Sequence, residues 1–343
     1  MKAIVIHGTC RGTIRFAMMV KRSLGKSIRF PILGLAMLTA FALRLVPGNA
    51  AHGIFYRNGF HLLRKHYYLP IPQEADLNSK FWEKRSELVG LEMNDTYAIG
   101  LLDSVFPLYL DEFRSSFSIH KSPADPAQFY LINSSFMAID AHVYYIFIRH
   151  FKPKQILEIG AGNSTLLAAA ACRQNRKEKN GEEPRLTAIE PFPNALLSEG
   201  FLGLSQLIKQ KVEDVNPELF SSLQSGDILF IDSTHVLRSG GDVQLEYCEI
   251  LPRLAPGVLV HIHDISLPKP YPRVYFENQL YFNEQYLLQA FLCFNSRFEV
   301  VWPANYMILK YPERVCNTFP EYHEMRKSYP MSEPSSFWMR VKA

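Results

Sequence analysis

Short apolar runs alternate with helix-like stretches along the C-terminal half of the chain. The strongest apolar runs are 155–160, 185–190, 226–232, 257–265 and 297–302, with a weaker one at 207–212. Between these runs, apolar residues recur at the three-to-four spacing of helices. Continuous apolar strands that alternate with helices are typical of a parallel sheet covered on both faces. We therefore predict an α/β domain over residues 151–343.

The end of this domain has a less regular pattern. Residues 304–319 fit either a strand followed by a loop or a helix. The run SFWMRV at 336–341 alternates apolar and polar positions, so we predict that it adds as a last, antiparallel strand. The predicted fold class is a Rossmann-like α/β sheet, mostly parallel, with an antiparallel last strand.

Residues 73–150 form a second zone with helical patterning. The stretches 81–93 and 97–113 place apolar residues three to four positions apart, and 136–151 resembles a long amphipathic helix. We predict that this zone is a helical N-terminal cap over the ligand pocket of the α/β domain.

Residues 1–72 form a third zone, a basic leader. The first 73 residues hold 11 of the 37 Lys and Arg residues and no Asp or Glu, which leaves 26 basic and 33 acidic residues in the rest. An apolar run at 32–43 predicts a short helix, and the aromatic, proline-containing stretch 59–72 predicts an extended arm. The body of the protein is therefore mildly acidic.

The apolar run of the leader has several interpretations. It ends at Arg44, well short of the roughly 20 apolar residues of a membrane-spanning helix. We favour a helix packed on the domain. The alternatives are a signal peptide with small residues at Ala50 and Ala51, and peripheral contact of residues 1–48 with an anionic membrane. The five scattered cysteines contain no CxxC pair and indicate a reducing compartment, so we predict a cytoplasmic protein.

The best chemical signal is the segment ILEIGAGNST, where a predicted strand meets a predicted helix. The strand ends at Glu158, and Gly160 and Gly162 follow it, so the backbone can turn sharply and a ligand can approach the main chain. A dinucleotide fingerprint would place its third glycine at position 165, which is Thr165. This departure favours the methyltransferase form of the turn, in which Glu158, the glycines and Ser164 hold the amino-acid part of S-adenosylmethionine (SAM).

Acids also close the next strands. Glu190 ends the second strand, where an acid can accept both ribose hydroxyls, and Glu213 follows the third, where an acid can meet an adenine amino group. Asp232 closes the fourth strand. Ligands of parallel sheets bind outside the carboxyl ends of the strands. Helix capping could explain one or two of these acids but explains the whole set poorly, so we predict that all three bind the cofactor.

A second group of polar residues lies at the ends of the fourth and fifth strands. FIDSTH contains Asp232 and His235, and HIHD contains His263 and Asp264. We interpret His235, His263 and Asp264 as catalytic residues that deprotonate an acceptor hydroxyl. A divalent metal on Asp232 and Asp264 is a possibility that we do not favour. Alternatively, the histidines only order the loops, and His261 is predicted to be a packed core residue.

Two segments that follow these motifs in the sequence also contain candidate site residues, and their roles are less clearly defined. The stretch 267–282 is rich in Tyr, Phe and Pro and forms either a substrate lid or a proline-stiffened crossover. Glu284 lies in the first turn of the next predicted helix, where a carboxylate suits the helix dipole, so we expect it to have a capping role.

The motifs ILEIGAGNSTLLAAA, AIEPFP, GDILFIDSTHV and VHIHDI resemble those of class I SAM-dependent methyltransferases, in particular the bacterial methyltransferase-24-like group. The resemblance covers residue 59 to the end of the chain. It implies that Glu158, Gly160 and Gly162 contact the methionine portion of SAM, that Glu190 contacts the ribose, and that Asp232 lies beside cofactor and substrate. Metal-dependent members carry Asn where this chain has Ile265, which argues against a metal.

These observations predict a SAM-dependent methyltransferase that methylates a hydroxyl of a small molecule or a saccharide, with His235 or His263 as the base. The alternatives are an NAD(P)-dependent oxidoreductase and a non-catalytic SAM-binding scaffold at a membrane. The acidic body and the irregular leader argue against a nucleic-acid partner.

Overall fold

The computed structural model describes residues 26–46, 48–120, 124–178 and 184–343 of the chain. The chain divides into two compact units, residues 1–72 and 73–343. In the described part of the first unit, the helices are α2 (Lys26–Leu45) and α3 (Gly48–Arg57). Among the described residues, no helix is both long enough and apolar enough to cross a bilayer.

Helix α2 does not bury its apolar side chains within its own unit. Ile32, Leu35, Met37 and Phe41 are all at least half exposed. The Arg64 side chain donates to the backbone oxygen of Val46 at 2.6 Å, which fixes the end of the helix. The described residues of this unit do not cover the apolar face of α2, and packing of this helix on the domain stays a prediction.

The second unit is built on a seven-stranded sheet with the order β3-β2-β1-β4-β5-β7-β6. The neighbouring strands from β3 to β5 pair in parallel, and β7 pairs antiparallel with both β5 and β6. The prediction of a mostly parallel sheet with an antiparallel last strand is confirmed. The strands are β1 (Gln155–Ile159), β2 (Arg185–Ile189), β3 (Gln206–Ile208), β4 (Ile228–Ile231), β5 (Leu259–Ile262), β6 (Phe298–Pro303) and β7 (Phe337–Val341).

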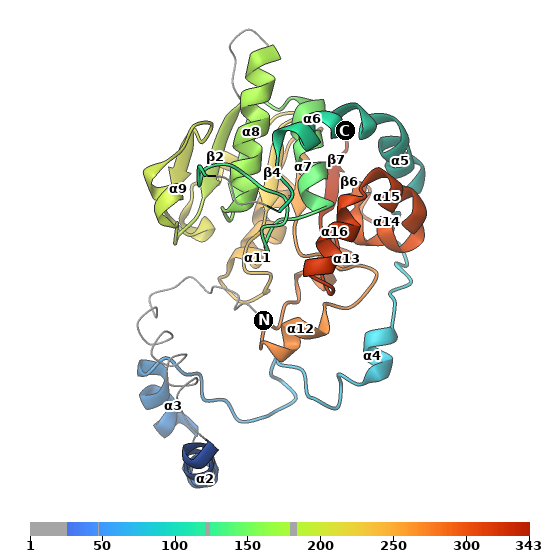
Figure 1. Ribbon diagram of the computed structural model, residues 1–343. Helices are drawn as coiled ribbons and strands as arrows, with labels where there is room; N and C mark the ends of the chain where they lie inside the picture. The colour runs from blue at the N-terminus through green and yellow to red at the C-terminus, as the bar shows by residue number, and fades with distance from the viewer. Residues whose placement is uncertain (1–25, 47, 121–123, 179–183) are drawn as a thin grey trace. The chain divides into compact units, whose positions relative to one another are not determined.

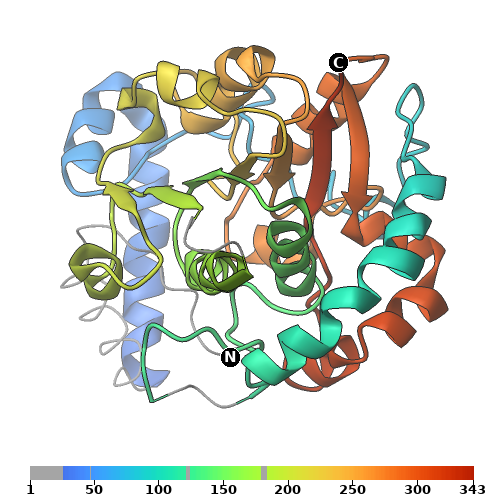
Figure 2. The same cartoon turned by 90° about the horizontal axis from the view of Figure 1, so that it is seen from above.

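Alternate residues of the strands enter two apolar clusters, one on each face of the sheet. On β1, Ile156 belongs to one cluster, and Leu157 and Ile159 belong to the other. Helices α7 (Asp140–Phe151) and α8 (Asn163–Glu178) pack side by side on the first face (Figures 1 and 2). The second face is covered by α10 (Glu218–Ser221), α11 (Asp242–Leu245) with the π-helical turn η3 (Glu246–Ile250), and α13 (Glu284–Leu292).

The remaining helices lie at the ends of this second unit or join its strands. They are α4 (Ser79–Glu83), α5 (Asp95–Gly100) with η1 (Leu101–Val105), α6 (Pro107–Ser116), α9 (Ala195–Glu199), η2 (Val212–Asp214), η4 (Leu251–Arg253), α12 (Arg273–Glu277), α14 (Ala304–Lys310), α15 (Pro312–Thr318) and α16 (Glu321–Ser328). Residues 304–319 are therefore helical, which decides between the two alternatives left open by the sequence.

Two helix predictions were wrong in part. Only α4 forms near the start of the expected helix 81–93, because Leu88 and Gly90 adopt positive φ angles of 53° and 76° that end any helix there. Helix α7 is buried from Asp140 to Arg149 on every side and is not amphipathic. It lies between the sheet and α6, so its outer face is covered as well.

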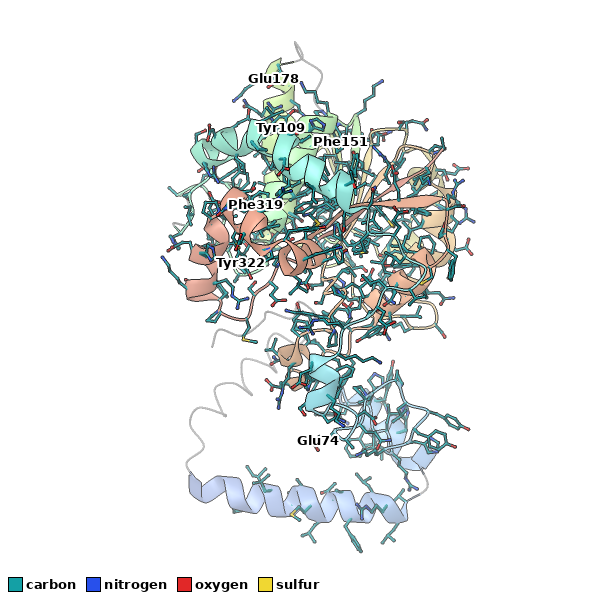
Figure 3. The ribbon with its side chains drawn as sticks, turned by 90° about the vertical axis from the view of Figure 1, so that its right-hand side faces the viewer. Glu74, Tyr109, Phe151, Glu178, Phe319 and Tyr322 are labelled. Carbon is teal, nitrogen blue, oxygen red and sulfur yellow. The ribbon has the colours of Figure 1, made fainter. Side chains whose placement is uncertain are left out.

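The outer end of α7 is fixed by charged side chains. Arg149 is buried and donates from Nε to Glu112 of α6 at 2.6 Å, and it also pairs with Glu178 of α8. The ring of Tyr109 lies 6.0 Å from the guanidinium carbon, and Tyr109, Phe151 and Glu178 are labelled in Figure 3. The helices of residues 73–150 thus cover a face of the sheet, and their role as a cap over a pocket stays a prediction.

Candidate functional site

The strand order brings the ends of β1, β4 and β5 to one edge of the sheet. Strand β4 lies between β1 and β5 and pairs in parallel with both. Gly160 follows β1 directly, Asp232 follows β4, and Asp264 comes two residues after β5. The sequence motifs that were predicted to act together therefore meet at the carboxyl edge, where ligands of such sheets bind.

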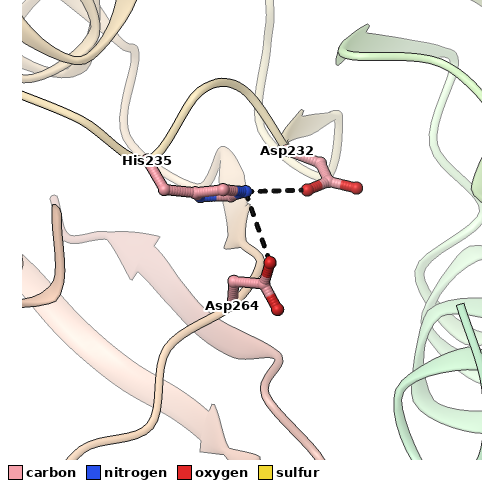
Figure 4. A group of neighbouring side chains, drawn as sticks. All are labelled: Asp232, His235 and Asp264. Atoms are coloured by element: carbon pink, nitrogen blue, oxygen red, sulfur yellow. Dashed lines mark ion pairs between the residues drawn. The ribbon is translucent and has the colours of Figure 1, made fainter. Parts of the chain in front are cut away.

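Asp232, His235 and Asp264 form a cluster at this edge (Figure 4). The Nε2 atom of His235 lies 3.2 Å from Oδ1 of Asp232 and 3.5 Å from Oδ2 of Asp264. The imidazole is 6% exposed, whereas the two carboxylates are 38% and 24% exposed. The two Asp side chains are thus the part of the cluster that a ligand can reach.

The backbone at two members of the cluster is in the left-handed region. His235 has a φ of +60° and Asp264 a φ of +55°. Non-glycine residues in this region cost roughly 1 kcal/mol or more and persist only where their surroundings hold them. The backbone oxygen of His235 accepts the N–H of Asn283 at 3.0 Å, and the Asn283 side chain accepts the N–H of Leu237 at 2.6 Å. These bonds hold the loop that carries the imidazole.

Glu284 lies directly behind His235, although the sequence suggested only a helix cap. Its side chain is fully buried, and Oε2 is 2.8 Å from Nδ1 of His235. The hydroxyl of Tyr247 donates to Oε1 at 3.2 Å. The capping interpretation is incomplete, because a buried carboxylate with these partners orients the imidazole. No sequence signal links Glu284 to His235, since their contact depends on how α13 packs against the β4 loop.

The charges of the cluster stabilise one another. Burial alone would lower the pKa of His235, but the hydrogen bonds to Asp232 and Glu284 raise it well above its ordinary value. Partial burial acts to raise the pKa of Asp232, and the charges of His263 and His235 outweigh that effect and lower it. These partners favour the charged form of the His235 imidazole, and its role as a base stays a prediction.

His263 also lies at this edge and is buried to about the same degree as His235. Neither of its ring nitrogens has a hydrogen-bond partner among the described residues. Its Nδ1 is 3.7 Å from Oδ1 of Asp264, and its Nε2 is 3.9 Å from Oδ2 of Asp140. Asp140, which the sequence analysis missed, accepts the N–H groups of Ser335 and Ser336. Burial raises the pKa of Asp140. The catalytic role of His263 stays a prediction.

The aromatic stretch 267–282 contributes side chains to the cluster. Tyr275 of α12 donates its hydroxyl to Oδ1 of Asp264 at 3.1 Å. The ring of Phe282 lies 4.9 Å from that of His235. This stretch therefore forms a wall of the site, whereas His261 is fully buried and packs against Phe230, as expected of a core residue.

The two glycines of the predicted cofactor turn have different environments. Gly160 has a φ of +84°, and a Cβ there would lie 2.0 Å from the backbone oxygen of Asp232. The protein itself therefore requires glycine at this position. A Cβ at Gly162 would meet no atom within 4 Å. Close approach of a ligand is a physical reason for glycine at the second position.

Glu158 and Ser164 lie beneath this turn. The Glu158 side chain is fully buried and accepts the Tyr144 hydroxyl at 2.9 Å, while its Oε2 has no partner among the described residues. Burial raises the pKa of Glu158 to about 7, although the Tyr144 hydroxyl acts to lower it. Ser164 is itself buried, and the cofactor-binding roles of both residues stay predictions.

The Glu190 side chain contacts the backbone of the glycine turn. Its Oε2 accepts the N–H of Ala161 at 3.4 Å and its Oε1 accepts the N–H of Phe192 at 2.8 Å. Glu213 lies apart in the short helix η2 and is half-buried. The structure thus brings Glu190 to the glycine turn, and the cofactor-binding roles of both acids stay predictions.

A pocket lies at the opposite, amino-terminal edge of the sheet. Its lining includes Phe151, Gly226 and Gly257, which precede strands β1, β4 and β5. Two of its charged side chains, Glu299 and Arg340, form an ion pair at 2.7 Å with one another. This pocket lacks the histidines and the glycine turn, so we place the candidate site at the carboxyl edge.

Known proteins resemble this chain in sequence and fold. A family model described as a methyltransferase domain matches residues 157–265. An uncharacterised protein of Archaeoglobus fulgidus is 30% identical over 172 residues, which are 48% of this chain and 74% of that protein. The SAH-bound methyltransferase PaMTH1 of Podospora anserina has a TM-score of 0.37 and 14% identity, over 70% of this chain and 88% of its own. The SAH-bound O-methyltransferase of Bacillus cereus has a TM-score of 0.30 and 12% identity, over 73% of this chain and 98% of its own.

The matched domain covers the part of the chain that builds the candidate site. It runs from β1 through the glycine turn and ends just after Asp264. Together with the mostly parallel sheet and its antiparallel β7, this match identifies the class. The chain belongs to the class I SAM-dependent methyltransferases.

Proposed function

We propose that this chain transfers the methyl group of SAM to a hydroxyl of a small molecule or a saccharide. The observation that carries the proposal is the position of the Asp232–His235–Asp264 cluster beside the glycine turn. In sheets of this kind, one ligand can reach both features from the carboxyl edge.

The residues of the turn fit the cofactor. Gly162 leaves open space at the main chain, Glu190 offers carboxylate oxygens beside it, and the buried Glu158 lies in the strand that leads into the turn. When SAM is bound, its sulfonium supplies an activated methyl group, so the protein needs mainly to position the acceptor and remove a proton. The cofactor contacts predicted for Gly160 and Ser164 would come from backbone groups, because Gly160 has no side chain and that of Ser164 is buried.

The exposed carboxylates of the cluster are suited to hold the acceptor. The hydroxyl of an acceptor bound at the carboxyl edge of the sheet can donate to Asp264 or Asp232, whose side chains are 24% and 38% exposed. The acceptor oxygen then gives its proton to a carboxylate as its bond to the methyl carbon forms and the carbon–sulfur bond breaks. His235, held between the carboxylates, keeps them in place and balances their charge.

Methyl transfer with isotopically labelled SAM tests this function. The full-length protein is incubated with labelled SAM and a metabolite extract, and labelled products are identified by mass spectrometry. We expect a product labelled on oxygen, formed about 100-fold more slowly by Asp264→Asn. The control Asp214→Asn changes an exposed acid of η2 and is expected to behave as the wild type. Unchanged product formation by Asp264→Asn would refute the assigned role.

We also propose that the leader contacts an anionic membrane surface. The apolar run 32–43 is about 18 Å long at 1.5 Å per residue, which is too short to cross a core of about 30 Å. Its large side chains are exposed, and the first 73 residues carry 11 basic and no acidic residues. An exposed apolar helix with flanking positive charge is suited to lie in the headgroup region of a bilayer.

Co-sedimentation with vesicles tests the membrane contact. We expect the full-length protein to sediment with phosphatidylserine-containing vesicles and much less with phosphatidylcholine alone. The double variant Met37→Glu, Phe41→Glu changes two exposed residues of α2 and should abolish sedimentation. As a matched control, Val89→Glu changes an exposed apolar residue of the second unit and should have no effect. Equal sedimentation of both variants would contradict the proposal.

A further inference from the structure

The side chains around the His235 ring carry more negative than positive charge. Asp232, Asp264 and Glu284 contribute three carboxylates, and the charged form of His235 balances one of them. Asp140 and His263 leave this balance unchanged, because their pair is neutral whether its proton lies on the carboxyl group or on the imidazole. Three negative charges against one positive charge give the group a net charge of −2.

The described residues supply no further cation to the exposed part of this group. Asp232 and Asp264 form ion pairs with histidines, and no Lys or Arg in the described part of the chain pairs with either of them. SAM would bring one positive charge, that of its sulfonium, because the two charges of its amino-acid part cancel. One negative charge would then remain for the acceptor to balance.

His263 is an independent indication of a polar ligand at this place. Its side chain is more than nine-tenths buried, and neither ring nitrogen has a hydrogen-bond partner among the described residues. Its Nδ1 lies 3.7 Å from Oδ1 of Asp264. A buried polar atom without a partner costs roughly 1–3 kcal/mol, and a ligand that donates a hydrogen bond would remove that cost.

Aromatic rings flank the carboxylates. Tyr275 donates its hydroxyl to Asp264 at 3.1 Å, and its ring lies 5.0 Å from that of Phe282, which in turn lies 4.9 Å from that of His235. Carboxylates accept the N–H groups of an organic cation strongly, and aromatic faces attract such a cation within about 6 Å. The same negative charges disfavour an acceptor that carries a phosphate or a carboxylate.

We infer that the methyl acceptor carries a protonated amine close to its hydroxyl, as an amino sugar or an amino alcohol does, and that Asp232 binds this amine. The inference rests on the proposed function and narrows its acceptor class. The ammonium nitrogen has no lone pair, so it is not methylated. The hydroxyl oxygen bonds to the methyl carbon and gives its proton to Asp264, while the carbon–sulfur bond breaks and leaves a neutral thioether.

Fractionation of a metabolite extract tests the charge of the acceptor. The extract is passed over a cation exchanger at about pH 7, where aliphatic amines are protonated, and each fraction is incubated with the full-length protein and labelled SAM. We expect at least about 10-fold more labelled product from the retained fraction than from the flow-through. Treatment of the retained fraction with acetic anhydride in water, which turns amines into neutral amides, should remove most of this product.

Binding of the acceptor identified in this way tests the role of Asp232 without turnover. Calorimetry of the full-length protein with S-adenosylhomocysteine present should show at least about 10-fold weaker acceptor binding by Asp232→Asn. Asp214→Asn, which changes an exposed acid of η2, is the matched control and should bind as the wild type does. Circular dichroism of both variants separates loss of the charge from loss of the fold.

Several outcomes would overturn the inference. Product that forms only from the flow-through, or to the same extent after acetylation, would show that the acceptor needs no amine. Unchanged acceptor affinity in a folded Asp232→Asn variant would remove Asp232 from its recognition. In these cases methyl transfer itself stands, whereas the absence of labelled product from every fraction would contradict the proposed function as well.

Discussion

At the scale of single residues, the two glycines of the cofactor turn have distinct roles. We expect Gly160→Ala to lower the free energy of unfolding by at least ~2 kcal/mol, because its φ is +84° and its Cβ would collide with the backbone of Asp232. Gly162→Ala should leave stability nearly unchanged, because its Cβ meets open space, and should instead weaken SAM binding. Chemical denaturation and calorimetric titration with SAM measure the two effects.

The comparison of the two variants is its own control, since both make the same chemical change two positions apart. Equal loss of stability in both would show that the turn is only structural. Unaltered SAM affinity in a folded Gly162→Ala variant would place the cofactor elsewhere.

Some site residues could be predicted from the sequence because they directly follow strands. Asp232 and the glycine turn come at the ends of clear apolar runs, and parallel pairing brings such ends together. Glu284 and Tyr275 could not be identified in this way. Their contacts with His235 and Asp264 depend on the tertiary path of the chain after β5, which no local pattern encodes.

At the scale of the elements, helix α7 is the clearest departure from its sequence pattern. The stretch 136–151 has polar residues at positions that suggest an exposed face, yet Asp140, His142 and Arg149 are all buried. Each faces a partner from another element: Asp140 accepts N–H groups next to β7, His142 lies 3.6 Å from Glu321 of α16, and Arg149 pairs with α6 and α8. Periodicity alone cannot distinguish a polar residue with a buried partner from one in water.

His142 of α7 makes stability depend on pH. Burial lowers its pKa to about 4 from an ordinary value of 6.5. The unfolded chain therefore takes up a proton at a higher pH than the folded chain, so this contribution is fully present above pH 6.5 and is lost as the pH falls toward 4. The loss amounts to about 3 kcal/mol.

Denaturant unfolding at several pH values measures this effect. The wild type should lose stability between pH 6.5 and 4 more steeply than His142→Gln, which has no titrating ring. His323→Gln changes an exposed histidine and should retain the slope of the wild type. The same slope in wild type and His142→Gln would contradict the assignment.

At the scale of the whole molecule, the strand order brings the candidate site residues to one edge of the sheet. Central β4 has β1 on one side and β5 on the other, so the glycine turn and both acidic strand ends share one edge. The alternation of strands and helices predicted a mostly parallel sheet with a shared carboxyl edge, but not the order of its strands. The insertion of β7 between β5 and β6 could be predicted only as an antiparallel addition, because its neighbours are set by packing.

The central claim is that the carboxyl edge binds SAM, and equilibrium titration of the full-length protein with SAM and with NAD⁺ tests it most directly. The account predicts saturable one-site binding of SAM, weakened in Gly162→Ala, and no binding of NAD⁺. Saturable binding of NAD⁺ with no response to SAM would contradict it.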